Sequence, residues 1–170
     1  MVKIRGQSRR IALSGILLAL CLATLIIQSI FPLANYTIYI LSSLYISIVI
    51  IEIGALAGVT FYFASVILAL LIVPNKVFLL PFIVFFGLYG LIKYLTEKTG
   101  KLYIEMPLKY LFFNLVAFLS IYFFKDMLFQ SINLPDFPYV ILIIIAEIGF
   151  LAYDYFYTLF IGFYTRRIKK

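Results

Sequence analysis

Two carboxylates, Glu147 and Asp154, interrupt the apolar stretch 143-IIIAEIGFLAYDYFY-157. Charged groups in such a stretch are the first candidates for a binding or catalytic role. Glu147 and Asp154 are seven residues apart, so on a helix they lie on nearly one face, about 10 Å apart along the axis. A carboxylate near the bilayer centre costs roughly 2.5–3.5 kcal/mol on insertion scales, which makes it a functional candidate by default. We therefore expect this face to point into a helix bundle.

Two interpretations of these carboxylates remain open from the residues alone. Each could bind a ligand, or each could be a buried, hydrogen-bonded group that holds helices together. Asn114, tyrosine hydroxyls and a ligand cation are the candidate partners of Glu147 and Asp154. Glu52 is expected near the cytoplasmic interface, which favours a structural role for it.

The other groups that catalysis would require are missing from the sequence. The chain has no histidine, a single cysteine (Cys21) and no cluster of metal ligands. It also lacks a Gly-x-Ser-x-Gly nucleophile motif, a His-Glu-x-x-His helix and a glycine-rich phosphate loop. We predict that the protein is not an enzyme, has no cofactor and cannot hydrolyse ATP itself.

The amino-acid composition indicates that the helices carrying these residues lie in a membrane. The 170 residues are 65% hydrophobic and 12% charged, and the mean hydropathy is +1.14. A soluble domain is about half apolar and a quarter charged, so the excess apolar surface must face lipid. We predict an all-α integral membrane protein that forms one domain over residues 1–170.

Apolar runs and prolines divide the chain into about six spans. Proline stands near several of the expected ends, as is typical of helix starts and stops. The expected spans are 11–31, 37–53, 56–73, 77–93, 108–125 and 139–163. The segment 52-EIGALAG-58 is then a tight turn with Gly54 and Gly58 as its pivots.

The lysines and arginines predict the orientation. Twelve of the fourteen fall on one side of a six-span topology, and only Lys76 and Lys125 fall on the other. The twelve are Lys3, Arg5, Arg9, Arg10, Lys93, Lys98, Lys101, Lys109, Arg166, Arg167, Lys169 and Lys170. Cytoplasmic loops carry the excess of basic residues, so both termini are expected in the cytoplasm. The net charge of +7 is attributed to topology and anionic lipid rather than to nucleic acid.

Small residues recur along the first span. Gly15, Ala19 and Ala23 are four residues apart, which makes a groove where another helix can approach closely. The groove is interpreted either as packing within the bundle or as a docking face for a separate membrane subunit. Among the many aromatics, Tyr36, Tyr39 and Tyr139 lie near the outer mouth, where a membrane-interface belt explains them better than stacking on a ligand.

Size, topology and two motifs resemble the substrate-binding S components of energy-coupling factor transporters. The motifs are the basic start 9-RRIALSGILLALCLA-23 and the glycine-flanked 54-GALAGVTFYFASVILALL-71. Ala19 and Ala23 match the family's Ala-x-x-x-Ala docking pattern. No vitamin-binding signature is present, and the short outer loops depart from the family's ligand-capping first loop.

The resemblance implies a nutrient-uptake subunit in a prokaryotic plasma membrane. Such a protein binds a small vitamin-like molecule from outside and docks on a transmembrane coupling subunit driven by two ATPases. The expected ligand contacts are Glu147, Asn114, Asn75, Asn35 and Asp154, and an amine or polar heterocycle would suit the carboxylate. The alternatives are a non-transporting scaffold of a cell-envelope complex and a proton-coupled carrier that uses Glu147 and Asp154.

Overall fold

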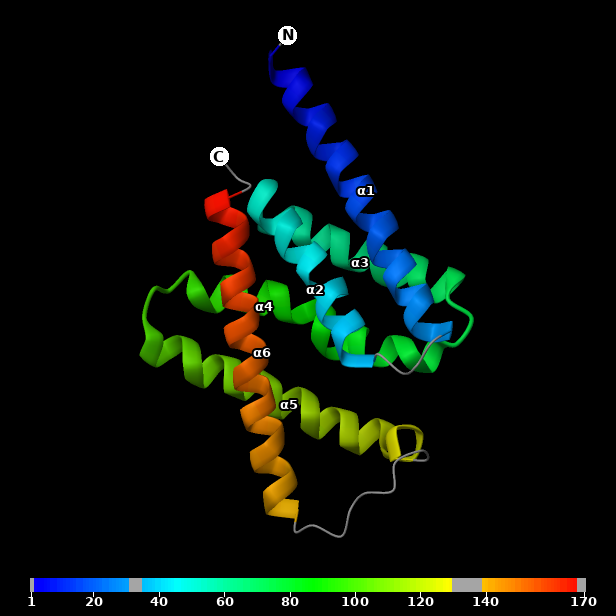
Figure 1. Cartoon of the computed structure of the whole chain (residues 1–170), viewed down its shortest axis with the longest axis vertical. Helices are drawn as coiled ribbons and strands as arrows, with labels where there is room; N and C mark the ends of the chain where they lie inside the picture. Colours follow the sequence, from blue (N-terminus) through cyan, green and yellow to red (C-terminus); the bar gives the residue numbers. More distant parts are fainter. Residues whose placement is uncertain (1, 31–34, 130–138, 168–170) are drawn as a thin grey trace. The chain divides into compact units, whose positions relative to one another are not determined.

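The computed structural model describes residues 2–30, 35–129 and 139–167, which form helices joined by short turns (Figure 1). In chain order the helices are α1 (Val2–Ile30), α2 (Asn35–Glu52), α3 (Ala55–Ile72), η2 (Lys76–Leu79), η3 (Phe82–Phe86), α4 (Gly87–Glu97), α5 (Leu102–Phe129) and α6 (Tyr139–Arg167).

Within the described residues, five helical stretches are long and apolar enough to cross a membrane. They are Ser8–Ile30, Ala55–Ile72, Lys76–Glu97, Leu102–Phe123 and Ile143–Arg167. The apolar part of α2, Thr37–Glu52, is shorter, although the whole helix has 18 residues and is about 27 Å long. The predicted class, an all-α integral membrane protein, is confirmed.

Several helix borders differ from the sequence prediction by four residues or more, including the ends of α4 at Glu97 and of α5 at Phe129. Helix α1 already begins at Val2, and α6 continues to Arg167. Helix α5 begins at Leu102, so Pro107 lies inside the helix rather than before it. Proline is tolerated there because the backbone carbonyl that loses its donor belongs to Tyr103, an exposed residue near the helix start.

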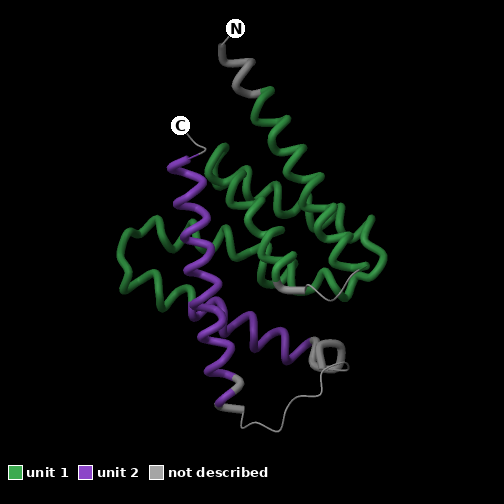
Figure 2. The backbone as a smooth tube through the Cα atoms, viewed as in Figure 1, with its two compact units in different colours: residues 1–109 green, residues 110–170 purple. Residues whose placement is uncertain are grey.

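The chain divides into two compact units, residues 1–109 and 110–170, and the division falls within α5 (Figure 2). In the first unit α2 packs against α1, α3, α4 and η3, which makes it the central helix of that unit. In the second unit α6 crosses α5. Each unit is described separately below.

The interior of the first unit contains hydroxyl groups that are hydrogen-bonded both within α2 and between α1 and α2. Ser42 and Ser43 are fully buried on α2 and donate to carbonyls of the preceding turn, Ile38 O at 2.9 Å and Ile40 O at 2.7 Å. Thr24 Oγ1 lies 2.9 Å from Ser42 Oγ and joins α1 to α2. Small hydroxyl residues let membrane helices approach closely while their polar atoms stay paired.

Of the two glycines predicted as pivots of the turn between α2 and α3, only Gly54 has that role. Gly54 has a φ of 129°, a conformation that favours glycine, and its N–H donates to Val49 O at 3.4 Å. Gly58 is not a pivot of the turn but a buried residue of α3. A Cβ atom there would lie 3.3 Å from Leu91 Cδ2 and closer still to the Ile50 side chain, so close helix packing requires this glycine.

The fourth span is broken at Pro81. Proline has no N–H, so it cannot donate to Val77 O one turn earlier. The N–H of Leu80 donates to Val77 O instead, in the tighter geometry of the 3₁₀ helix η2. The π-helix η3 follows, and Gly87 N–H donates to Phe82 O rather than to Ile83 O.

Two tyrosines from neighbouring helices supply donors to carbonyls of this irregular segment. Tyr39 of α2 donates its hydroxyl to Phe78 O, and Tyr62 of α3 donates to Ile83 O at 2.7 Å. The Tyr39 ring also stacks on Phe86, with ring centroids 5.4 Å apart. Tyr39 thus has a structural role here. The break is stable because irregular backbone at membrane depth is buried in protein and finds donors there.

Candidate functional site

The second unit contains a polar pair between two apolar helices. Asn114 of α5 donates from Nδ2 to Glu147 Oε1 of α6 at 2.8 Å. The same amide nitrogen donates to Tyr110 O, one turn earlier on α5, at 3.0 Å. Both amide hydrogens are therefore used, and they fix the Asn114 side chain with its amide directed at the carboxyl group.

The second oxygen of Glu147 is buried and has no hydrogen-bond partner among the described residues. Glu147 as a residue is half-buried, and Asn114 is exposed on α5. A buried carboxyl oxygen without a donor costs free energy, and a proton, a cation or a donor group of a ligand would remove that cost. This atom is a point at which a further group would be stabilised.

Aromatic rings join the two helices beside this pair. Phe150 of α6 stacks on Phe113 of α5, with ring centroids 4.7 Å apart and an interplanar angle of 13°. Tyr110 meets the same Phe150 ring edge-on at 5.6 Å. These contacts hold α5 against α6 one turn from Glu147, and they keep the surroundings of the carboxyl group apolar.

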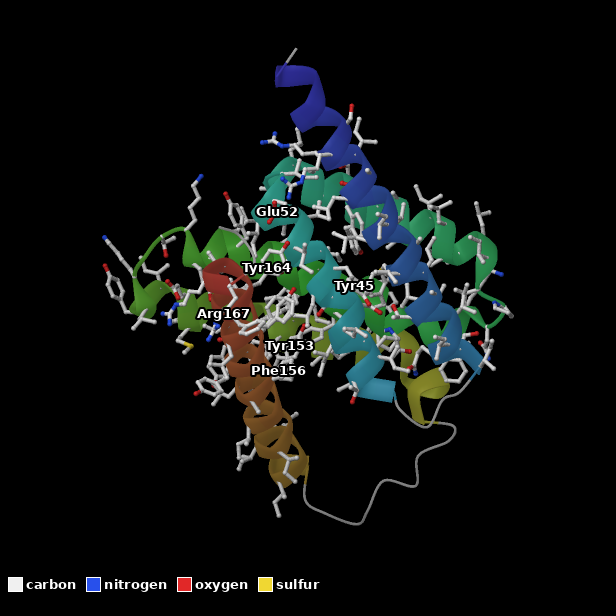
Figure 3. All side chains as sticks on the ribbon, turned by 45° about the horizontal axis from the view of Figure 1, so that its top comes forward. Tyr45, Glu52, Tyr153, Phe156, Tyr164 and Arg167 are labelled. Atoms are coloured by element: carbon white, nitrogen blue, oxygen red, sulfur yellow. The ribbon has the colours of Figure 1, made fainter. Side chains whose placement is uncertain are left out.

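Asp154 lies on the buried face of α6, two turns from Glu147. This face carries Phe150, Tyr153, Asp154 and Tyr157, all less than a tenth exposed, whereas Phe156 of the same helix is exposed (Tyr153 and Phe156 are labelled in Figure 3). The seven-residue spacing keeps the two carboxylates about 10 Å apart along the helix, too far to share a proton or an ion. Asp154 and Glu147 are therefore two separate polar positions.

The other predicted ligand contacts, Asn75 and Asn35, belong to the first unit and are described within it. Asn75 is exposed before η2, and its Oδ1 accepts from the Val77 N–H at 3.1 Å, which makes it a helix cap. Asn35 is the first residue of α2, and its side chain lies outside the described part. Glu52 is the last residue of α2.

The small-residue stripe of α1 faces outward. Gly15, Ala19 and Ala23 are exposed, and a Cβ atom built on Gly15 would meet nothing within 4 Å. The buried face of α1 consists of other residues: Leu17, Cys21, Leu25 and Gln28. Of the two interpretations of the stripe, packing within the bundle receives no support from these positions.

An ion cluster between α4 and α5 was missed by the sequence analysis, which treated its lysines as topology signals only. Lys93 Nζ lies 2.6 Å from Glu97 Oε1, and Lys109 Nζ lies 2.8 Å from the same oxygen. Both lysines are buried. The four-residue spacing of Lys93 and Glu97 is a sequence signal for such a pair, but the burial of Lys109 depends on tertiary structure.

Metal binding finds no support in the described residues, where no three acidic or thiol side chains come together as a ligand set. Fold and hydropathy define an all-α integral membrane protein. Compared with known proteins, the chain matches no family model, no curated protein and no solved structure.

Proposed function

We propose that the protein is the membrane-embedded substrate-binding subunit of an uptake system for a small, vitamin-like nutrient. The observation that carries the proposal is the buried Glu147 oxygen without a partner, beside a second oxygen that Asn114 holds in place. An N–H group or an ammonium of the ligand would complete this site. Binding rather than conversion of the ligand is proposed, because the sequence contains neither a Gly-x-Ser-x-Gly nucleophile motif nor a histidine base to act with the carboxylate.

The energy for uptake would come from separate subunits. A transmembrane coupling subunit with ATPases would dock on the exposed stripe of Gly15, Ala19 and Ala23, where small side chains allow close helix contact. The resemblance to S components of energy-coupling factor transporters supports this arrangement. The proposed location is the plasma membrane of a prokaryote, with both termini cytoplasmic, as the distribution of basic residues favours.

The presence of a bound ligand is tested by mass spectrometry of the purified protein. Wild-type protein purified in a mild detergent is expected to release a stoichiometric small molecule on denaturation. Glu147→Gln keeps the size of the side chain and removes its charge, so it is expected to lose at least ten-fold of that ligand. Glu52→Gln is the matched control and should retain it. A wild-type protein without any bound metabolite contradicts the proposal and favours the scaffold alternative.

Docking is tested by co-purification. Ala19→Leu places a bulky side chain in the stripe and is expected to abolish association with the coupling subunit and ATPases. Ala152→Leu, at another exposed alanine on α6, is the control and should leave the association unchanged. Full retention of the partner by Ala19→Leu counts against docking at this face.

A further inference from the structure

The connection between α4 and α5 exposes basic and apolar side chains together. Lys98 and Lys101 are exposed and lie three residues apart in the turn. Next to them the side chains of Leu95, Leu102 and Tyr103 are 58%, 71% and 71% exposed. Basic groups flanked by exposed apolar and tyrosine side chains are typical of the membrane–water interface.

The turn that carries these lysines has a defined conformation. Thr99 N–H donates to Thr96 O at 3.2 Å, and Gly100 N–H donates to Glu97 O at 3.1 Å. Gly100 has a φ of 65°, which ends α4 in the manner of a glycine C-cap. The backbone of Lys98 and Lys101 is therefore ordered before any ligand binds, which lowers the entropic cost of binding.

The positive charge of the connection is not cancelled by its glutamates. Residues 93–109 contain four lysines and two glutamates, which leaves a net charge of +2. Glu97 is approached by Lys93 and Lys109 from the buried side, at 2.6 and 2.8 Å. Its negative charge is therefore already compensated, and Lys98 and Lys101 on the exposed side carry the excess.

The first turn of α5 adds backbone N–H donors, which favour an anion as the lysines do. Ile104 and Glu105 N–H both donate to Lys101 O, at 2.9 and 3.0 Å. The N–H groups of Leu102 and Tyr103 precede them, in the first turn, where backbone donors have no intrahelical acceptor and the helix dipole favours an anion. Lys101 Nζ lies 5.9 Å from the centroid of the Tyr103 ring, so this lysine is held beside the helix start.

We infer that the α4–α5 connection is a binding site for the phosphate group of an anionic membrane phospholipid. Lys98 and Lys101 pair with the phosphate, and Leu95, Leu102 and Tyr103 lie against the glycerol and upper acyl chains. An anionic lipid is favoured over a zwitterionic one because neither glutamate of the segment is available to balance a choline or ethanolamine cation: Glu97 is already paired with Lys93 and Lys109, and Glu105 is buried. This inference is independent of the proposed nutrient site.

The test measures which lipids stay bound to the intact protein. Full-length protein is reconstituted in nanodiscs of equal parts phosphatidylcholine and phosphatidylglycerol, and the lipids retained after release are counted by native mass spectrometry. Wild-type protein is expected to enrich phosphatidylglycerol. A basic residue near an anionic surface contributes about five-fold to the affinity, so Lys98→Gln with Lys101→Gln should reduce the enrichment by about that factor for each lysine. Lys98→Arg with Lys101→Arg should retain it.

Lys76→Gln is the matched control, because Lys76 is an exposed lysine at the start of η2, outside this turn. Equal enrichment in wild type and the double glutamine variant overturns the inference. An equal loss in Lys76→Gln also overturns it, because net charge alone would then explain the effect. Release of phosphatidylglycerol by millimolar inorganic phosphate, without a change at equal ionic strength of chloride, would assign the site to soluble phosphate instead. Circular dichroism of each variant checks that the helices are intact.

Discussion

The broken fourth span and the α5–α6 pair differ in whether their polar groups find hydrogen-bond partners within the protein. In the fourth span, the register change at Pro81 frees backbone carbonyls, and Tyr39 and Tyr62 donate hydroxyls to two carbonyls there. In the α5–α6 pair, Asn114 satisfies one oxygen of Glu147 and the other stays buried without a described partner.

This difference distinguishes polar groups that stabilise the fold from polar groups that are candidates for ligand binding. A polar group that serves the fold has its partners within the fold, and its removal should lower stability. A polar group that is left incomplete is a cost to the fold, and its removal should leave stability unchanged or raise it while the function is lost. The predictions below test this contrast, from the largest expected change in stability to the smallest.

The largest effect is expected at Gly87, where the π-helix meets α4. A Cβ atom there would lie 2.7 Å from Tyr62 Cε2 and 2.8 Å from the backbone oxygen of Phe82, which cannot move aside easily. Gly87→Ala is therefore expected to destabilise the protein by about 3 kcal/mol, read as a lower midpoint of thermal unfolding in detergent. Gly162→Ala, where a Cβ atom meets nothing within 4 Å, is the control. Equal midpoints for the two variants would contradict the packing of the break.

Tyr62→Phe should have the next largest effect. It keeps the ring and removes the hydroxyl donor to the partly buried Ile83 O, at a cost of about 1–3 kcal/mol. Tyr122→Phe, at an exposed tyrosine of α5, removes a hydroxyl from the surface and should change little. An unchanged unfolding midpoint for Tyr62→Phe would show that this hydroxyl does not stabilise the break.

A smaller loss is expected from Asn75→Ala. The substitution removes the side-chain acceptor of the Val77 N–H at the start of η2, worth about 1 kcal/mol for an exposed cap. Hydrogen exchange at the Val77 amide should become faster while the ligand content stays the same. A loss of ligand from this variant would instead support the predicted contact between Asn75 and the substrate.

The sequence predicts the class of fold and part of the candidate site. Apolar runs, their length and the prolines near their ends were enough for the helices, because the membrane environment demands helical backbone along each span. Asn114 was one of the partners considered for Glu147, and their hydrogen bond is present, since α5 and α6 offer few other polar side chains.

Features that depend on tertiary contacts were not predictable. Pro81 indicates a disturbance, but the tyrosines that complete it come from α2 and α3, 42 and 19 residues earlier in the chain. The burial of Lys93 and Lys109 around Glu97 was missed for the same reason. The outward direction of the Gly15, Ala19 and Ala23 stripe also depended on which face of α1 is buried in the first unit.

The most direct test of the central contrast compares Glu147→Gln with wild type in one purification, with unfolding midpoint and bound small molecule measured on the same samples. The account predicts that the variant unfolds at or above the wild-type midpoint and loses at least ten-fold of the bound molecule. A lower midpoint with the bound molecule retained would contradict it, because Glu147 would then be a structural residue like Tyr62.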